Sequence, residues 1–353
     1  MAGQPDLESK IISTVPDEST SPTSGDAESE GEVVNLVFGV ADHGVRIDKC
    51  LANQLTGISR GYIQQCLSQG DVLVNGRAVL KASATVKAGD VCRIDLKPTD
   101  QARSFVAEDI PLDVVYEDPH LLVVNKPAGL VVHPAAGNWS GTLLNGLLHH
   151  HAGAAMLPRA GIVHRLDKDT SGLMVVAKSR AVMDALVGQI AAREVTRLYL
   201  AITGRQWVGP RQRQVDQPMG RDPSNRLRMA VLSGGVGSKP ARTQFVRLDG
   251  CDNAALVACK LFTGRTHQIR VHLSSIGYPI LGDGLYGGRS STSIQRQALH
   301  ATRLMLTHPV HGTPLDFSAP LAPDMACCLD GLGLHYNTGD LSPDLFGSFP
   351  GTP

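Results

Sequence analysis

Short apolar runs separated by polar turns dominate the sequence between residues 121 and 318. Each run has the usual length of a β-strand, roughly 3–10 residues. The candidate strands cover residues 121–124, 130–132, 162–166, 172–177, 198–202, 243–248, 255–262, 298–306 and 315–318. Many strands with short turns and only a few helices predict an α+β domain, in which a largely antiparallel, mixed β-sheet is flanked by helices.

The flanking helices begin at side chains that cap helix N-termini. Thr142 precedes a segment predicted to be helical to about His149, and Ser179 precedes one that extends to about Arg193. A hydroxyl at this position accepts a hydrogen bond from the first free amides of a helix. A third helix is predicted to open at Thr266 and to end before Gly277.

The residues before this domain show a different order of elements. A helix is predicted over 45–55, and a second begins with Ser59 as its N-cap and ends near Gly70. A short strand at 72–74, the tight turn Asn75-Gly76 and an alternating strand at 91–96 follow. Two helices and a hairpin in so short a segment predict a small separate domain.

The net charge of zero hides an uneven distribution of charge along the chain. Residues 1–32 contain eight acidic residues and one Lys, a net charge of −7. The remainder contains 32 basic and 25 acidic residues, a net charge of +7. A basic body is typical of a protein that binds a polyanion, whereas a Ser/Thr/Pro/Glu-rich terminus is typical of a solvated, disordered arm.

The length of 353 residues and the changes of pattern along it set the expected domain boundaries. We expect a disordered acidic tail at 1–35, the small domain at 36–98 and a linker at 99–110. The sheet domain follows at 111–328, and a Gly/Pro-rich tail at 329–353.

Composition also excludes several classes of protein. No apolar run approaches the ~20 residues of a membrane-spanning helix, so no membrane association is expected. No basic stretch followed by an apolar run begins the sequence, so a secreted protein is not expected either. Seven cysteines without a CxxC pair argue against a disulfide framework and against a structural zinc site. We therefore expect a cytoplasmic protein without a bound metal.

The densest group of chemically active side chains is HRLDKDTSG at residues 164–172. It lies between two predicted strands, so rigid elements would hold it in place. A polar turn explains the residues from Asp169 to Gly172. It does not explain why His164, Arg165 and Asp167 interrupt an apolar strand.

Three interpretations of Asp167 compete. It could be an acyl-phosphate nucleophile, as in haloacid-dehalogenase-type phosphohydrolases, but that chemistry needs Mg²⁺ and further carboxylates. The nearest candidate is Asp283, and Gly287 stands where a second acid would be needed. Asp167 could also be a structural cap or ion-pair partner. The third interpretation is a catalytic carboxylate, and it follows from a resemblance.

Residues 164–167 (HRLD) followed by 170–172 (TSG) are similar to the HRLDxxTSG motif of the RluA family of pseudouridine synthases. Further motifs of that family occur along the chain in its order: KPAG at 126–129 with VHP at 132–134 before this segment, and RLY at 197–199, TGRTHQIRVH at 263–272, and GD at 282–283 with LHA at 299–301 after it. Five motifs in order make the resemblance specific. Residues 36–98 resemble an S4 domain, a small RNA-binding module. The chain is most similar to the D-type members, which act on large-subunit ribosomal RNA.

The resemblance implies a pseudouridine synthase fold and the isomerisation of uridine within RNA, with no metal or other cofactor. Asp167 would be the nucleophile or base, with Arg270 as its ion-pair partner. Tyr199 would stack on a flipped uracil and Leu299 would form an apolar wall of the pocket, while Arg165 would fill the gap that the base leaves. The further residues implied to contact RNA are Arg265, His267, Lys239 and Arg60.

The implied partner is large-subunit ribosomal RNA, either free or in an assembling ribosomal subunit. The implied targets are uridines in the helix 69 stem-loop, and the protein is expected to act as a monomer. The alternative is a non-catalytic RNA-binding factor for ribosome assembly, whose pocket is inactive.

Overall fold

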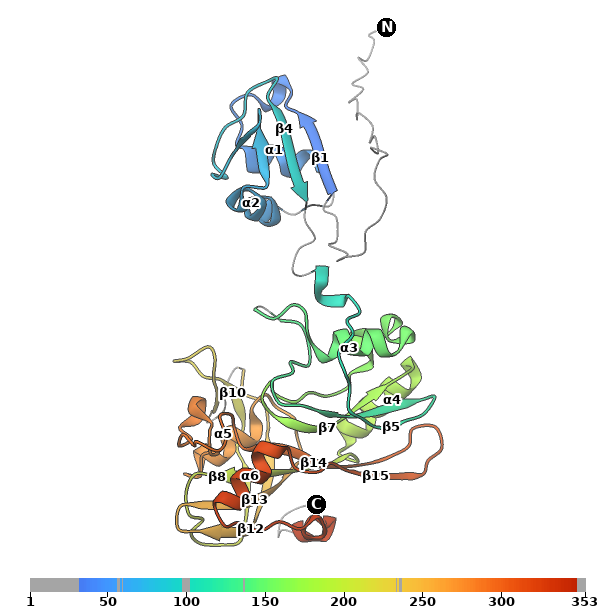
Figure 1. The fold of residues 1–353 in the computed structure, drawn as a ribbon, viewed down its shortest axis with the longest axis vertical. Helices are drawn as coiled ribbons and strands as arrows, with labels where there is room; N and C mark the ends of the chain where they lie inside the picture. Colours follow the sequence, from blue (N-terminus) through green and yellow to red (C-terminus); the bar gives the residue numbers. More distant parts are fainter. Residues whose placement is uncertain are drawn as a thin grey trace. The chain divides into compact units, whose positions relative to one another are not determined.

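The computed structural model describes residues 32–55, 58, 60–96, 102–135, 137–232, 234 and 237–347. The chain divides into two units between Arg103 and Ser104 (Figure 1). Ser59, which is predicted to be an N-cap, lies outside the described residues, as do residues 1–31 of the acidic segment.

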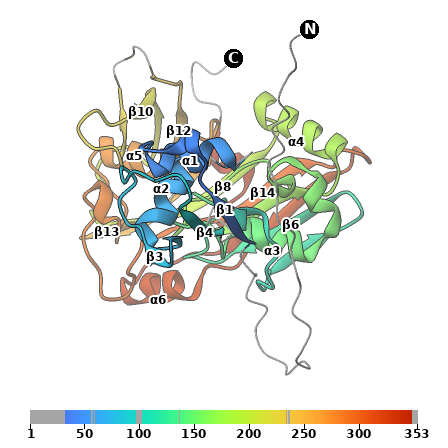
Figure 2. The same cartoon turned by 90° about the horizontal axis from the view of Figure 1, so that it is seen from above.

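The N-terminal unit contains two helices and a four-stranded sheet. Helices α1 (Ile47–Gln54) and α2 (Arg60–Gln69) pack against each other (Figure 2). The strand order is β1-β4-β2-β3, with all pairs antiparallel. The bounds are Glu32–Val37 for β1, Val72–Val74 for β2, Arg77–Ala78 for β3 and Val91–Leu96 for β4; a short 3₁₀ segment, η1, covers Val40–Asp42. Strand β1 thus begins four residues before the boundary expected at residue 36, because Val34 and Leu36 pack on the core of this unit.

The C-terminal unit is built on one large sheet with the order β5-β6-β7-β14-β8-β13-β12-β9, and β15 pairs with β14. The pairs are antiparallel except β7 with β14. The bounds are Val114–Glu117 (β5), Leu121–Lys126 (β6), Ser171–Ala177 (β7), Thr196–Thr203 (β8), Gln212–Asp216 (β9), Arg242–Cys251 (β12), Ala254–Leu261 (β13), Leu299–Thr307 (β14) and Pro314–Ser318 (β15). A separate antiparallel hairpin joins β10 (Met219–Arg221) and β11 (Met229–Val231). The predicted α+β class with a largely antiparallel sheet is confirmed.

The helices of this unit begin at or near the predicted caps. Thr142 caps α3 (Leu143–His150) by accepting a hydrogen bond from the amide of Asn145, and Ser179 caps α4 (Arg180–Ala192). Helix α5 (Gln268–Ser275) begins two residues after the predicted start, and α6 (Pro323–Gly331) follows the sheet. Short 3₁₀ segments cover Ala102–Phe105 (η2), Ala152–Met156 (η3), Pro158–Gly161 (η4), Gly284–Tyr286 (η5), Thr338–Asp340 (η6) and Pro343–Phe346 (η7).

Two of the predicted strands are wrong. Residues 130–132 and 162–166 each form a single bridge, Val131 with Thr142 and Ile162 with Val176. Strand β7 already pairs with β6 along its length and with β14 at its start. Farther along β7, the ring nitrogen Nε2 of His164 accepts the amide hydrogen of Val175 at 3.1 Å, so a side chain takes the place of a neighbouring strand.

The C-terminal residues also differ from the prediction. The Gly and Pro content of 329–353 predicts a loose tail, but Leu334, Leu341 and Phe346 are buried in the main core of the unit. Widely spaced apolar residues are enough to fix a segment that has little regular structure, because each one buries its own side chain.

Gly172 fixes the distance between β7 and β14. Its φ of +115° is unfavourable for other residues, and a Cβ atom here would lie 2.2 Å from the carbonyl oxygen of Ala301.

Gly172→Ala should therefore lower the free energy of unfolding by about 3 kcal/mol, measured by urea denaturation. Gly188→Ala is the control, since a Cβ on Gly188 of α4 meets nothing within 4 Å. That change should stabilise the protein by about 0.5–1 kcal/mol, and equal effects of the two changes would contradict the argument.

Candidate active site

Asp167 lies in the loop that leads into β7, at the point where β7 meets β14. Ser171 pairs with His300, and Gly172 with Ala301. This parallel pairing brings the loop of Asp167 and the start of β14 at Leu299 to the same end of the sheet.

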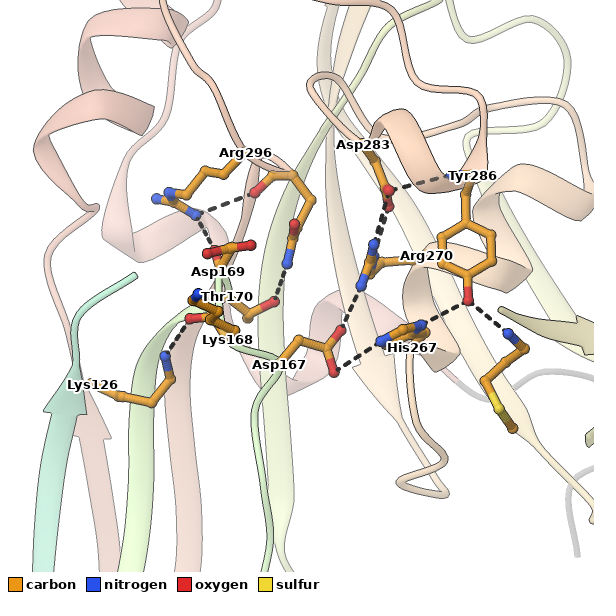
Figure 3. A network of polar contacts seen from close by, with 12 residues as sticks. Lys126, Asp167, Lys168, Asp169, Thr170, His267, Arg270, Asp283, Tyr286 and Arg296 are labelled. Carbon is orange, nitrogen blue, oxygen red and sulfur yellow. Dashed lines mark hydrogen bonds and ion pairs between the residues drawn. The ribbon is translucent and has the colours of Figure 1, made fainter. Parts of the chain in front are cut away.

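Two basic side chains, one buried and one largely enclosed, hold the backbone just after Asp167 (Figure 3). Lys126, which is 1% exposed, donates to the carbonyl oxygens of Pro127, Leu130 and Lys168 at 2.7, 2.9 and 3.0 Å. Burial lowers the pKa of Lys126 to about 7, against the opposing charges of Asp169 and Asp167.

The second cation is Arg296, which donates from Nη1 to the carbonyl oxygen of Asp169 at 2.9 Å. Its Nε and Nη2 atoms bind the carboxylate of Asp324 at 2.7 and 2.8 Å. The carbonyl groups of both residues that follow Asp167 are therefore fixed by side chains from distant segments. Sequence reasoning assigned no role to either residue, although Lys126 opens the KPAG motif and stands at the end of an apolar strand.

The carboxylate of Asp167 pairs with Arg270 of α5 (Figure 3). Arg270 donates from Nη1 to Oδ2 of Asp167 at 3.1 Å. Its other face binds Asp283 through two hydrogen bonds, Nε to Oδ2 at 2.7 Å and Nη2 to Oδ1 at 2.9 Å. Burial opposes the charge of Arg270, but Asp283 and Asp167 outweigh it and raise the pKa of the guanidinium. The structure thus brings Asp167 and Arg270 together, as expected from the sequence.

Asp283 is a residue of this site that sequence reasoning did not assign. Its side chain is only 1% exposed, and it precedes η5 in a turn. Gly282 before it has a φ of +78°, and a Cβ there would lie 2.1 Å from the carbonyl oxygen of Arg296. The available signals were the GD motif at 282–283 and a carboxylate between two glycines directly after the apolar pair at 280–281.

His267 and Tyr286 complete the polar network. The Nε2 atom of His267 lies 3.9 Å from Oδ1 of Asp167, and its Nδ1 atom lies 2.7 Å from the hydroxyl of Tyr286. The guanidinium of Arg270 lies 4.9 Å from the centre of the Tyr286 ring. His267 was expected to contact RNA, whereas nothing in the sequence indicated Tyr286.

A cavity of about 390 Å³ opens beside Asp167. Its volume is within the range of small-molecule sites. The lining residues are Asp167, Lys168, Asp169, His267, Arg270, Gly282, Asp283, Gly284, Leu285, Gln295, Arg296 and Gln297. The network of Asp167, Arg270 and His267 therefore faces a cavity of small-molecule size.

Tyr199 and Leu299 do not line this cavity but lie next to it in the sheet. Both are buried, Tyr199 on β8 opposite Ala301 and Leu299 at the start of β14. Burial raises the pKa of Tyr199 to about 12, with a smaller contribution in the same direction from the charge of Asp167. Tyr199 is therefore a neutral phenol within electrostatic reach of Asp167.

The predicted RNA-contacting cations fall into two groups. In the C-terminal unit, Arg165, Lys239 and Arg265 are exposed, and Arg265 donates to the carbonyl oxygen of Pro240 at 3.1 Å. Arg165 lies near enough to His267 to influence its charge. These side chains are free to meet phosphates.

Arg60 belongs to the N-terminal unit and already has a partner. It donates to the fully buried carboxylate of Asp48 at 2.9 Å, and Arg46 binds the same group at 3.0 Å. Burial would raise the pKa of Asp48, but hydrogen bonds from Arg46, Gln64 and Arg60 hold it well below its usual range. Arg60 therefore holds α2 to α1, and half of its side chain stays exposed.

Within the described part of the chain, no group of three or more His, Cys, Asp or Glu residues is arranged to hold a metal ion. In the run His149-His150-His151, His149 faces Asp109 and His150 contacts Glu117, so these two side chains have different partners. No helix among the described residues has the length and apolarity required to cross a bilayer.

Comparison with known proteins places these motifs in a family. Residues 120–275 match the RNA pseudouridylate synthase family, and residues 45–92 match the S4 domain. Ribosomal large subunit pseudouridine synthase D of Neisseria meningitidis is 44% identical over 303 residues, 83% of this chain and 80% of the relative. The chain therefore belongs to the RNA pseudouridylate synthases and is an isomerase of that class.

A second relative covers still more of the chain. Ribosomal large subunit pseudouridine synthase D of Nitrosomonas europaea is 44% identical over 326 residues, 89% of this chain and 92% of the relative. Among solved structures, human RNA pseudouridylate synthase domain containing 4 aligns with 64% of this chain and 94% of its own, at 27% identity and a TM-score of 0.49. The assignment rests on the sequence relatives, and the expected family and its fold are confirmed.

Replacement of each of the two carboxylates that bind Arg270 should have a different effect on the stability of the protein. Asp283→Asn removes the carboxylate that accepts two hydrogen bonds from the buried guanidinium of Arg270. It should lower the free energy of unfolding by about 3 kcal/mol. Asp167→Asn leaves the pair of Arg270 and Asp283 in place and should change it by less than about 1 kcal/mol. Urea denaturation of both variants measures the difference. A larger loss for Asp167→Asn would show that Asp283 is not the main support of Arg270.

Proposed function

We propose that this protein converts uridine to pseudouridine in large-subunit ribosomal RNA, with Asp167 as the nucleophile or base. The observation that supports this most is the geometry of Asp167, whose carboxylate is held at 3.1 Å by Arg270 on the wall of the cavity. The names of the relatives support the choice of RNA.

The reaction detaches uracil from its sugar, turns it and rejoins it through carbon. A carboxylate can assist as nucleophile or base only if it remains ionised while partly enclosed. The guanidinium of Arg270 pairs with the carboxylate of Asp167 and fixes the direction of its Oδ2 atom. Lys126 and Arg296 bind the carbonyl oxygens of the two residues that follow Asp167. These contacts would keep the backbone next to Asp167 from moving during the reaction.

A uridine in folded RNA must leave its stack to reach Asp167, at a cost of a few kcal/mol. Arg165 is exposed and two residues from Asp167, so its planar guanidinium is placed to stack where the base was. By the family resemblance, Tyr199 would supply an uncharged aromatic face for the extruded uracil, and Leu299 an apolar wall. Both side chains are buried beside the cavity, so this role requires the cavity to extend to them when RNA binds.

The basic residues would hold the RNA backbone. Arg265, Lys239 and the exposed half of Arg60 contribute positive charge that contacts phosphates without reading sequence. By analogy with the D-type relatives, the targets are uridines of the helix 69 stem-loop, in free RNA or in an assembling subunit. The protein would act as a monomer in the cytoplasm.

Asp167→Asn should abolish product while RNA binding persists, because the change removes the charge and keeps the shape. Product is measured by mapping pseudouridine in ribosomal RNA incubated with each variant, and binding by filter retention. Asp184→Asn on the exposed face of α4 is the control and should remain active. If wild-type protein makes no pseudouridine and yet retains RNA, it is a non-catalytic assembly factor instead.

The phosphate contacts predict a change in salt dependence. Lys239→Gln and Arg265→Gln should each reduce the slope of log K against log salt by about one unit. Arg180→Gln is the matched control, since Arg180 of α4 is exposed and paired with Asp184. Slopes that equal the wild-type value would remove these residues from the RNA contact.

A further inference from the structure

The ring of His267 faces Asp167 without bonding to it directly. The distance of 3.9 Å between Nε2 and Oδ1 is longer than a hydrogen bond, and both side chains line the cavity. An oxygen that lies beside this gap, rather than in it, is within hydrogen-bond distance of both groups. What His267 offers to such an oxygen depends on which ring nitrogen has the proton.

Tyr286 decides the position of that proton. The amide of Met229 in β11 donates to the hydroxyl oxygen of Tyr286 at 2.9 Å, which leaves the phenolic hydrogen for Nδ1 of His267 at 2.7 Å. Nδ1 is then an acceptor, so the proton of the neutral ring is on Nε2. The opposite tautomer would direct a lone pair at the carboxylate of Asp167 and leave the phenolic hydrogen without an acceptor.

The surroundings of His267 favour the neutral ring. Burial lowers its pKa, and the charges of Arg270 on α5 and Arg165 in the catalytic loop act in the same direction. The carboxylates of Asp167 and Asp283 oppose this lowering but do not reverse it. His267 is therefore uncharged at neutral pH and donates only from Nε2.

The backbone and the neighbouring arginines hold this arrangement in place. His267 has a φ of +57°, a left-handed conformation that is unfavourable for a residue with a side chain. Such strain persists where a functional geometry requires it. The Tyr286 ring contacts Arg270, with its centre 4.9 Å from that guanidinium, and Arg228 before β11 at 5.4 Å.

We propose that Tyr286 is a positioning residue that fixes His267 as a neutral donor, whose Nε2–H group meets an oxygen of the bound nucleoside beside Asp167. The hydroxyl of Tyr286 does this by accepting from the hairpin backbone and donating to Nδ1. The nucleoside as ligand rests on the proposed function, whereas the position of the proton does not.

The position of the proton is tested by NMR of the full chain labelled with ¹⁵N-histidine, in the absence of RNA. The His267 signals are assigned by their loss in His267→Gln. In the wild type, Nε2 should be protonated and Nδ1 unprotonated, and Tyr286→Phe should disturb that pattern and raise the pKa of His267. A proton on Nδ1 in the wild type, or an unchanged tautomer and pKa in Tyr286→Phe, would overturn the proposal.

Kinetics then test the contribution to catalysis. Tyr286→Phe should lower kcat/KM about 10-fold and move the acidic limb of its pH profile to higher pH. The sign follows because a donor to Nδ1 stabilises the neutral ring, so its removal raises the pKa of His267 and protonation begins at higher pH. Tyr278→Phe is the matched control, because its hydroxyl bonds Val208 and Arg213 instead, and it should leave the profile unchanged.

Tyr286→Phe introduced into the His267→Gln variant distinguishes a positioning role of Tyr286 from a structural one. His267→Gln keeps a donor near the place of Nε2 that does not depend on a tautomer. Tyr286→Phe should therefore cost less than about twofold in that background. An equal loss in both backgrounds would assign Tyr286 a structural role only and would overturn the proposal. Full activity of Asp167→Asn would reject the proposed function, while the NMR result would still decide where the proton lies.

Discussion

A single buried guanidinium, that of Arg270, joins two carboxylates, and the rest of the site is arranged around it. Asp283 is almost fully buried and binds Arg270 through two hydrogen bonds, so the cost of burying that cation is largely offset there. Asp167 can then occupy the remaining Nη1 atom at the edge of the cavity. Because the three residues come from separate segments, their pairing also fixes the catalytic loop, α5 and the turn before η5 relative to one another.

The two carboxylates that bind Arg270 differ in exposure, so Asp167 is suited to contact a substrate and Asp283 to support the guanidinium. Asp167 keeps 16% of its side chain exposed, whereas Asp283 keeps 1%. A group that must reach a substrate has to remain accessible, and it can do so because another anion neutralises Arg270. Lys126 and Arg296 act in a similar way on the backbone, since each fixes one carbonyl group next to Asp167 without entering the reaction.

Much of this could be predicted from local sequence. The helix caps at Thr142 and Ser179 could be predicted because each cap contacts an amide three residues away. Most strands of the large sheet could be predicted because burial imposes an apolar pattern on the strand's own residues. The pairing of Asp167 with Arg270 followed from the order of motifs. Tyr286 and Arg296 were missed because their partners lie in other segments, and no pattern within a short window reports such contacts. Arg60 was expected from the resemblance to contact RNA, and only the structure shows that it also pairs with the buried carboxylate of Asp48.

The parallel contact between β7 and β14 has a consequence for biosynthesis. It joins Ser171 to His300, so the two halves of the catalytic pocket are separated by more than a third of the chain. A ribosome that has translated the Asp167 loop must still add β8 through β14 before that loop has its final neighbour. Contacts between such distant residues form slowly, because a long loop must close first. The pocket beside Asp167 therefore remains unassembled until synthesis of the chain is almost complete.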